Sequence, residues 1–522
     1  MESDKVSFKK FIKSNRILFF IIILVMLFSY GYAITIADDL SIDEDITANS
    51  TIDRQKTVWY GFGRYGIPIV YKVFFPRFAA LPFFNMLLSV CAIGLTAFIM
   101  CYFLSKILNP AKAPKLAYYF FAAMVISYPS SIDYLSFNNL NFSVALGLLL
   151  TGVAVYIVSK WVLNKESIVY GLLGLILSSF TISIYQSFVG VYLVFAVAFV
   201  LAYIYKKNIL KEEQSFKRIL VIILKYLIIL AVAVALYYAV NWLILKIMVR
   251  NTNGYTESLI QMGSFKQIIY NLYFNLKYLL IEGGVRGGEN ITYVVLVFIL
   301  SQIGLLFKNG LKNRTAIIIL SFALIFAPFA LAIILPGIMV RALTGLSIMV
   351  GFAGFFAIVA ISMLLEKIKI KKIDYKKIVF GVLAVLTIFV CYMQMYRTNL
   401  YYYGTHVRYQ RDEAFAHMLA ADIIEEIEDV KPDLPVFVLG EYEIAVANNI
   451  DRTAFTGSFF SYDQVPIRVG LFMRYLGYKF EMPDQELFDK AKDYADVMPA
   501  WPKDGSIKET EECIIVKLSD KY

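Results

Sequence analysis

Cysteine and histidine are scarce in this sequence, and their scarcity argues against several kinds of site. The 522 residues include four cysteines and two histidines. Cys91, Cys101 and Cys391 lie within apolar runs, and Cys513 stands alone near the C-terminus. The spacing therefore offers neither a disulfide framework nor a CxxC metal motif. With only two imidazoles, a histidine-rich metal site is not expected either.

Charged residues are also few. They make up 17% of the chain, whereas apolar residues make up 59%, more than the ~50% of a typical soluble domain. The excess lies in runs of about 20 apolar residues, the length at which a helix crosses the hydrocarbon core. The net charge of +10 then reflects lysines in cytoplasmic loops and not a nucleic-acid partner. We therefore expect a polytopic α-helical membrane protein.

Length and hydropathy predict about eleven transmembrane helices. The first follows a basic stretch and could be a signal peptide, but its apolar core is too long and no small-residue cleavage site ends it. We expect it to be retained as a span. The predicted spans are 17–37, 83–105, 116–131, 142–163, 168–184, 187–205, 219–248, 291–307, 315–335, 342–365 and 378–396.

Lysine and arginine predict the orientation of these spans. With the N-terminus inside, every predicted inner loop is basic, as cytoplasmic loops usually are. A transmembrane catalytic domain, 1–396, with a long first outer loop, 38–82, is then followed by an extracytoplasmic domain, 397–522. Apolar spacing predicts that this tail is a small α/β domain. Its expected helices are 405–429 and 484–494, and its expected strands are 436–439 and 513–518.

The first outer loop begins with a cluster of carboxylates. Six acidic residues occupy 16 positions, and Asp38 and Asp39 lie where the first span leaves the membrane. Partial burial and a neighbouring like charge both raise a carboxyl pKa, which makes a better general base. The alternative is a solvated loop start that merely ends the helix.

Aromatic and basic residues follow in the same loop. The stretch 59–65 combines glycines, whose backbone can approach a ligand closely, with Arg64, whose planar fork suits phosphate. Lys72 and Arg77 come next, among aromatics and prolines. Snorkelling of these three basic side chains towards lipid headgroups is an equally good interpretation.

Two other outer positions are candidates for binding. Arg341 lies in the outer loop between two predicted spans, where a positive charge runs against the positive-inside trend. A charge there suggests a functional residue, and a structural salt bridge is the alternative. Gln186 lies in a tight outer turn, where it could hydrogen-bond a sugar or cap the turn. The glycine-rich stretch 283–289 lacks the strand and the GK[ST] of a P-loop, so we expect a flexible outer loop there.

Several short motifs, spread over nearly the whole chain, occur together. They are Asp38-Asp39, Trp59 with Gly63-Arg64-Tyr65, Tyr185-Gln186, Arg341-Ala342, and Met498-Pro499-Ala500-Trp501-Pro502 with Gly505-Ser506. Taken together, these motifs resemble the bacterial Gtr-type glucosyltransferases, the family with the GtrII-like domain. The residue at position 65 is tyrosine where many relatives are expected to have tryptophan, a change that affects sugar stacking more than chemistry.

The resemblance implies a GT-C architecture. Such an enzyme would take a sugar, expected to be glucose, from a polyprenyl-phosphate carrier and pass it to a cell-envelope polysaccharide. The transfer would occur on the outer face of the bacterial cytoplasmic membrane. A donor synthase and a small flippase would be its functional partners.

The chemistry of this reaction suggests a role for each candidate residue. A lipid phosphate leaves as a stable anion, so one carboxylate base suffices, unlike the two carboxylates of glycosidases. Mg²⁺ or Mn²⁺ bound by Asp38 and Asp39 is compatible with the acidic loop but not required by it. We expect Asp38 as the base, Asp39 in support, Arg64 and Arg341 on the donor phosphate ahead of Lys72 and Arg77, and Trp59, Tyr65, Gln186 and Trp501 on sugars.

Three other interpretations stay open. A transporter or flippase of lipid-linked sugars would explain the spans, but it explains the acidic loop less well and the paired broken helices of repeat-built transporters are not evident. A different envelope enzyme, such as an acyltransferase or a polysaccharide ligase, is the second. A non-catalytic scaffold that displays the tail is the third.

Overall fold

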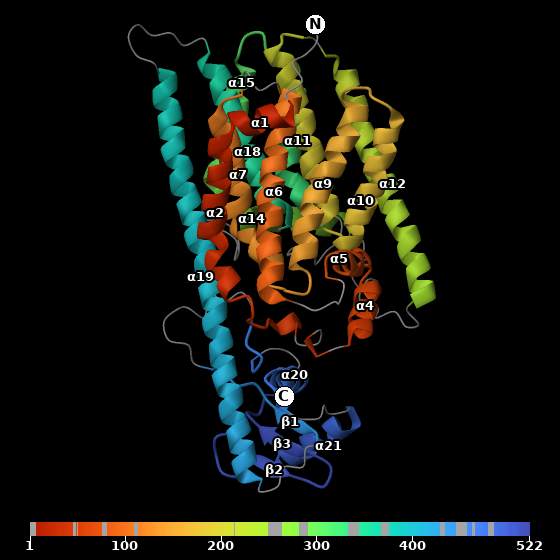
Figure 1. Ribbon diagram of the computed structural model, residues 1–522, viewed down its shortest axis with the longest axis vertical. Coiled ribbons are helices and arrows are strands. Elements are labelled where there is room, and N and C mark those ends of the chain that lie inside the picture. Colours follow the sequence, from red (N-terminus) through yellow and green to blue (C-terminus); the bar gives the residue numbers. More distant parts are fainter. Residues whose placement is uncertain are drawn as a thin grey trace. The chain divides into compact units, whose positions relative to one another are not determined.

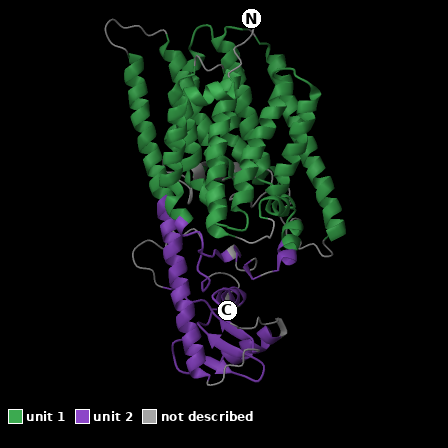
Figure 2. Ribbon diagram, viewed as in Figure 1, with its two compact units in different colours: residues 1–34, 56–398 green, residues 35–55, 399–522 purple. Residues whose placement is uncertain are grey.

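The chain divides into two compact units, which Figure 2 colours separately. Unit 1 contains Met1–Ile34 and Lys56–Thr398, and unit 2 contains Thr35–Gln55 and Asn399–Tyr522. The first outer loop of the sequence analysis is thus shared between the units. The structure, a computed structural model, describes residues 7–44, 48–49, 51–75, 81–108, 113–212, 214–248, 264–280, 291–331, 344–366, 375–427, 434–444, 457–461, 465–478 and 485–521.

Helices form the described part of unit 1, and one occupies each predicted span. Seven are long and apolar enough to cross a membrane: α2 (Arg16–Thr35), α6 (Pro82–Leu108), α9 (Asn141–Val162), α11 (Phe188–Ile209), α12 (Phe216–Met248), α18 (Leu346–Leu365) and α19 (Tyr375–Glu426). The other four are shorter: α7 (Lys115–Ser127), α10 (Ile168–Ile184), α15 (Ile291–Leu306) and α16 (Arg314–Phe326), which η3 (Ala327–Phe329) extends. The count of eleven spans therefore stays a prediction.

The long helices of unit 1 run alongside one another (Figure 1) but bury different shares of their surface. Helices α11 and α18 are largely buried, whereas α2, α12 and α19 leave most of their apolar windows exposed. On α2 the exposed side chains include Ile17, Phe20 and Leu27. A continuous apolar face of this kind is unfavourable in water and is normal against lipid. Unit 1 therefore has the surface of a membrane protein.

Lysines lie at the ends of several of these helices. Lys106, Lys160 and Lys206 lie in the last turns of α6, α9 and α11. A positive charge there complements the partial negative charge at a helix C-terminus. The same lysines belong to the loops that the sequence assigns to the cytoplasm.

Unit 2 combines helices with a three-stranded sheet. The strand order is β1-β3-β2, with β1 (Val436–Leu439) parallel to β3 (Ile514–Lys517) and β2 (Ile507–Glu509) antiparallel to it. Helices α20 (Val465–Tyr475) and α21 (Gln485–Ala495) accompany the sheet. The sequence predicts β1, β3 and α21, whereas it misses α20 and β2.

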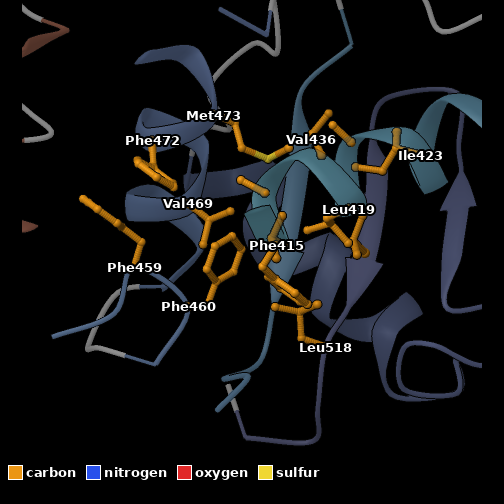
Figure 3. Packing of buried hydrophobic residues seen from close by; sticks show 14 of the residues in the cluster. Phe415, Leu419, Ile423, Val436, Phe459, Phe460, Val469, Phe472, Met473 and Leu518 are labelled. Carbon is orange, nitrogen blue, oxygen red and sulfur yellow. The ribbon is translucent and has the colours of Figure 1, made fainter. Parts of the chain in front are cut away.

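The C-terminal part of α19 contributes one wall of the core of unit 2. Phe415, Leu419 and Ile423 face strand residues such as Val436 in the cluster that Figure 3 shows. Leu40 and Ile42, which come shortly after α2 in the chain, are buried in the same cluster. The start of the predicted first outer loop therefore folds as part of unit 2.

Helix α19 does not end where the last predicted span ends. The sequence predicts a span at 378–396 and a separate helix at 405–429, but a single helix covers both up to Glu426. Apolar residues give way to polar ones after residue 396, yet residues 375–426 contain no proline. A change in hydropathy can end a span without ending a helix, because the backbone hydrogen bonds continue.

Candidate active site

A tight turn in unit 1 positions Arg64 between α4 (Ile52–Gly61) and α5 (Gly66–Phe74). Gly63 has a φ of +67°, a left-handed conformation that glycine adopts without strain. Its carbonyl accepts a hydrogen bond from the Tyr237 hydroxyl at 3.0 Å. A Cβ atom at position 63 would come within 2.6 Å of that hydroxyl. The turn therefore requires glycine immediately before Arg64.

The guanidinium of Arg64 lies among aromatic rings. Its Cζ atom is 4.7 Å from the ring centroid of Tyr185, 5.8 Å from that of Phe62 and 5.9 Å from that of Trp59. The side chain is buried. Aromatic faces attract a cation, and the attraction is stronger when the cation is removed from water. We call Trp59, Phe62, Arg64, Tyr185, Gln186 and Tyr237 the Arg64 cluster.

Gln186 holds the same turn through its amide nitrogen. The Nε2 atom donates to the carbonyl of Phe62 at 2.9 Å and to the hydroxyl of Tyr237 at 3.1 Å. Its Oε1 atom, and the Oδ1 atom of Asn241 on α12, are buried and accept no hydrogen bond from the described residues. Tyr237 and Asn241 are not among the predicted site residues, although polar residues four positions apart in an apolar span are a recognisable signal.

The other basic and aromatic candidates of the first outer loop have different settings. Trp59 and Tyr65 are buried, and the ring of Tyr65 stacks on Tyr237 at 6.0 Å. Their contact with a sugar stays a prediction. Lys72 is exposed on α5. Arg77, Arg341 and the glycine-rich stretch 283–289 lie outside the described residues.

The two aspartates belong to unit 2 and differ from one another. Asp39 leaves 15% of its side chain exposed, and its Oδ2 atom lies 2.7 Å from Nδ1 of His406 on α19. An ionised carboxylate can only accept, so the imidazole N–H donates when Asp39 is charged. Asp38 is exposed, and its backbone carbonyl accepts from the hydroxyl of Tyr475 at 3.5 Å.

The surroundings of Asp39 raise the pKa of its carboxyl. Burial raises the pKa of the Asp39 carboxyl to about 6. The negative charges on Glu413 and Asp38 also raise this pKa, whereas His406 lowers it. A carboxyl with a pKa near 6 is largely ionised at neutral pH and accepts a proton more readily than an ordinary aspartate. The sequence predicts Asp38 as the base, and the burial of Asp39 makes Asp39 the alternative candidate; the assignment stays a prediction.

His406 was not among the predicted site residues. In the sequence, the two histidines are weighed only as metal ligands. A histidine shortly beyond the last apolar run, on the same predicted side of the membrane as the aspartate pair, was the available signal. Its pairing with Asp39 joins residues 367 positions apart, which no local pattern reports.

Trp501 lies against the core of unit 2. Its indole Nε1 atom donates to Oδ2 of Asp422 at 2.9 Å. The ring meets Phe415 and Tyr442 edge-on, at centroid distances of 5.2 Å and 5.4 Å. These contacts support a packing role, and contact with an acceptor sugar stays a prediction.

The described residues contain no group of three or more histidines, cysteines, aspartates or glutamates placed to hold a metal ion. Oδ2 of Asp39 is already engaged by His406. A metal ion held by Asp38 and Asp39 stays a prediction.

A comparison with known protein families shows which family this chain belongs to. Residues 31–358, more than half of the chain, match the family model described as Glucosyl transferase GtrII. The chain belongs to the GtrII glucosyltransferase family. No significant match was found among curated proteins or among solved structures.

Membership of the GtrII family confirms the resemblance that the motifs indicated. It implies glycosyltransferase activity, with a sugar donor and an acceptor, and so favours an enzyme over a transporter or a scaffold. The matched region contains Asp38, Asp39, Arg64 and Gln186. His406 and Trp501 lie beyond it.

Proposed function

We propose that this GtrII protein transfers glucose from a polyprenyl-phosphate carrier to a cell-envelope polysaccharide. The reaction is assigned to the outer face of the bacterial cytoplasmic membrane. The family match supports the glucosyl transfer. The exposed apolar faces of α2, α12 and α19 support an enzyme embedded in lipid, where a lipid-linked donor is available. The observation that carries the proposal is the partly buried carboxylate of Asp39 in a member of this family.

In the proposed reaction Asp39 is the general base. The oxygen of an acceptor hydroxyl attacks the anomeric carbon of the donor sugar, and its proton passes to the carboxylate of Asp39. The bond from the anomeric carbon to the phosphate oxygen breaks, and the lipid phosphate leaves with the electron pair. Because the phosphate is stable as an anion, its departure requires no general acid. A positioned base contributes roughly 10²–10⁴-fold to such a step.

We assign Arg64 to the donor phosphate. Its burial, its permanent charge and its fixed turn suit a planar contact with two phosphate oxygens. Such a contact strengthens as charge develops on the leaving group. The buried acceptor oxygens of Gln186 and Asn241 support a nearby contact with sugar hydroxyls. Arg341, Lys72 and Arg77 are kept as further candidates.

The identity of the sugar donor is tested with the purified protein in liposomes. Polyprenyl-phosphate glucose is supplied in one arm and a nucleotide-linked glucose in the other, with an extracted envelope polysaccharide as acceptor. We expect label to reach the polysaccharide only from the lipid-linked donor. Transfer from the nucleotide sugar alone would contradict the proposal. Glycan analysis of cells with and without the gene then identifies the acceptor.

The orientation requires a separate test. Cys513 is buried, so it cannot report which side of the membrane the tail occupies. The exposed residue Lys503 can, after Lys503→Cys in a Cys513→Ala background. We expect a membrane-impermeant reagent to label this cysteine in intact cells with a permeabilised outer layer. Glu166→Cys, in a predicted inner loop, is the matched control and should react only after lysis. The reverse pattern would contradict the orientation.

A further inference from the structure

His406 is paired with Asp39 inside unit 2. The Nδ1 and Oδ2 atoms are 2.7 Å apart, and the two side chains are 23% and 15% exposed. His406 contacts Oδ2 of Asp39, and among the described residues no hydrogen bond to its Oδ1 atom is seen. One carboxylate oxygen is thus fixed by the imidazole, and the other is left for a reactant.

Contacts other than the pair also hold the segment around Asp39. The Nδ2 atom of Asn49 donates to the carbonyl of Leu471 at 2.9 Å, and the guanidinium of Arg468 donates to the carbonyl of Ile42. Leu40 and Ile42 are also buried in the core of unit 2. These contacts do not involve His406. We therefore expect the segment to stay in place when the imidazole is removed.

We propose that His406 is a positioning residue for glucosyl transfer, and that its Nδ1–H fixes Oδ2 of Asp39 so that Oδ1 faces the acceptor hydroxyl. This inference rests on the proposed function, in which Asp39 is the base. A carboxylate bound by one rigid donor keeps a single orientation, and a displacement of about 1 Å in a reacting group can cost about 100-fold in rate. In this proposal His406, which follows the apolar part of α19, contributes to the reaction although it lies outside the residues that match the family.

His417 provides a matched control on the same helix. Its Nδ1 atom lies 2.7 Å from the hydroxyl of Tyr478, the same separation as in the His406 pair. The partner is a phenol instead of a carboxylate, and the site is exposed. His417→Ala therefore removes an equivalent imidazole contact from unit 2 without touching Asp39.

The experiment compares His406→Ala, His406→Asn, His417→Ala and Asp39→Asn in the liposome assay. Asparagine is informative because its amide nitrogen is bonded to Cγ, as Nδ1 of histidine is, so it can donate from the same place. We expect His406→Ala to lower kcat roughly 10–100-fold with little change in KM. His406→Asn should recover most of this loss, and His417→Ala should have wild-type kcat. The reactivity of the buried Cys513 thiol reports whether unit 2 remains folded in each variant.

The outcomes separate this inference from the function on which it rests. Wild-type kcat in His406→Ala, with Asp39→Asn inactive, would overturn the positioning role and leave Asp39 as the base. Equal losses in His406→Asn and His406→Ala, with Cys513 protected, would make the imidazole itself the base and also overturn it. Full activity in Asp39→Asn would instead show that Asp39 is not the general base, and would contradict the proposed function.

Discussion

The two units bury their apolar residues in opposite ways. In unit 1, α2, α12 and the apolar part of α19 present large side chains outward. In unit 2, apolar side chains from α19, α20 and the sheet are enclosed in a cluster, with Leu40 and Ile42 among them. The first arrangement suits lipid and the second suits water. The proposed function, with a lipid-linked donor and a polysaccharide acceptor, would use both environments.

The candidate site residues are likewise divided between the two units. The Arg64 cluster in unit 1 offers a buried cation among aromatic rings, which suits the phosphate of a lipid. Asp39 and His406 in unit 2 offer a carboxylate and an imidazole, which suit proton transfer from a hydroxyl. If this division is correct, changes in unit 1 affect donor use, and changes in unit 2 affect the proton step or the stability of that unit.

The largest effect expected in unit 1 comes from Arg64→Lys. Lysine keeps the charge but loses the planar fork, and hydrogen bonds to a charged group contribute about 1.5–3 kcal/mol. We expect the KM for the donor to rise roughly 10-fold or more, with Cys513 still protected. Arg54→Lys makes the same exchange at an exposed position on α4, so it is the control and should change KM little. If Arg64→Lys has the wild-type KM for the donor, Arg64 does not bind the donor phosphate.

Asp412→Ala should have the largest effect on unit 2. The buried carboxylate accepts from the Ser458 hydroxyl at 2.7 Å and from the Phe459 N–H at 2.8 Å. Leaving a buried N–H without its acceptor costs about 1–3 kcal/mol. The labelling rate of Cys513 should therefore rise roughly 5–150-fold as the unit opens more often. The exposed Asp504→Ala serves as the control, and an unchanged rate in Asp412→Ala would show that this contact does not stabilise unit 2.

The pH dependence of transfer tests the environment of Asp39. The base acts when it is deprotonated, and its pKa is raised from 3.8 to about 6. Activity should therefore be complete above this pKa and fall roughly 10-fold for each pH unit below it. Glu413→Gln removes a negative charge that raises the pKa, so the fall should begin at lower pH. A rate that is constant between pH 7 and pH 5 would contradict Asp39 as the base.

Trp501→Phe should have the smallest effect. Phenylalanine keeps an aromatic ring against Phe415 but loses the indole hydrogen bond to Asp422. One hydrogen bond contributes about 1 kcal/mol, so Cys513 labelling should rise about 5-fold. The KM for the acceptor should stay unchanged. A rise in acceptor KM without faster labelling would favour sugar stacking by Trp501 over packing.

Much of the helical layout could be predicted from the sequence because hydropathy is a local property. Each predicted span contains a helix, and β1 and β3 lie where apolar runs predict strands. The boundary inside α19 could not be predicted in the same way. Loss of hydropathy after residue 396 indicates where a span ends, whereas helix continuation depends on backbone hydrogen bonds.

The candidate site was only partly predictable for a similar reason. Asp39 and Arg64 stand out in local motifs, and both lie in the family match. His406, Tyr237 and Asn241 matter through contacts with residues far away in the chain. The choice between Asp38 and Asp39 also depends on burial, which two adjacent aspartates do not reveal. Long-range packing makes one of them exposed and places the other against His406.

The most direct test of the account is the transfer rate of Asp39→Asn beside that of Asp38→Asn. Both substitutions keep the shape of the side chain and remove its charge, so insertion should be normal. The account predicts that Asp39→Asn lowers kcat roughly 10²–10⁴-fold, the contribution of a general base, while Asp38→Asn lowers it less than about 10-fold. A larger loss in Asp38→Asn than in Asp39→Asn, with Cys513 protected in both, would contradict it.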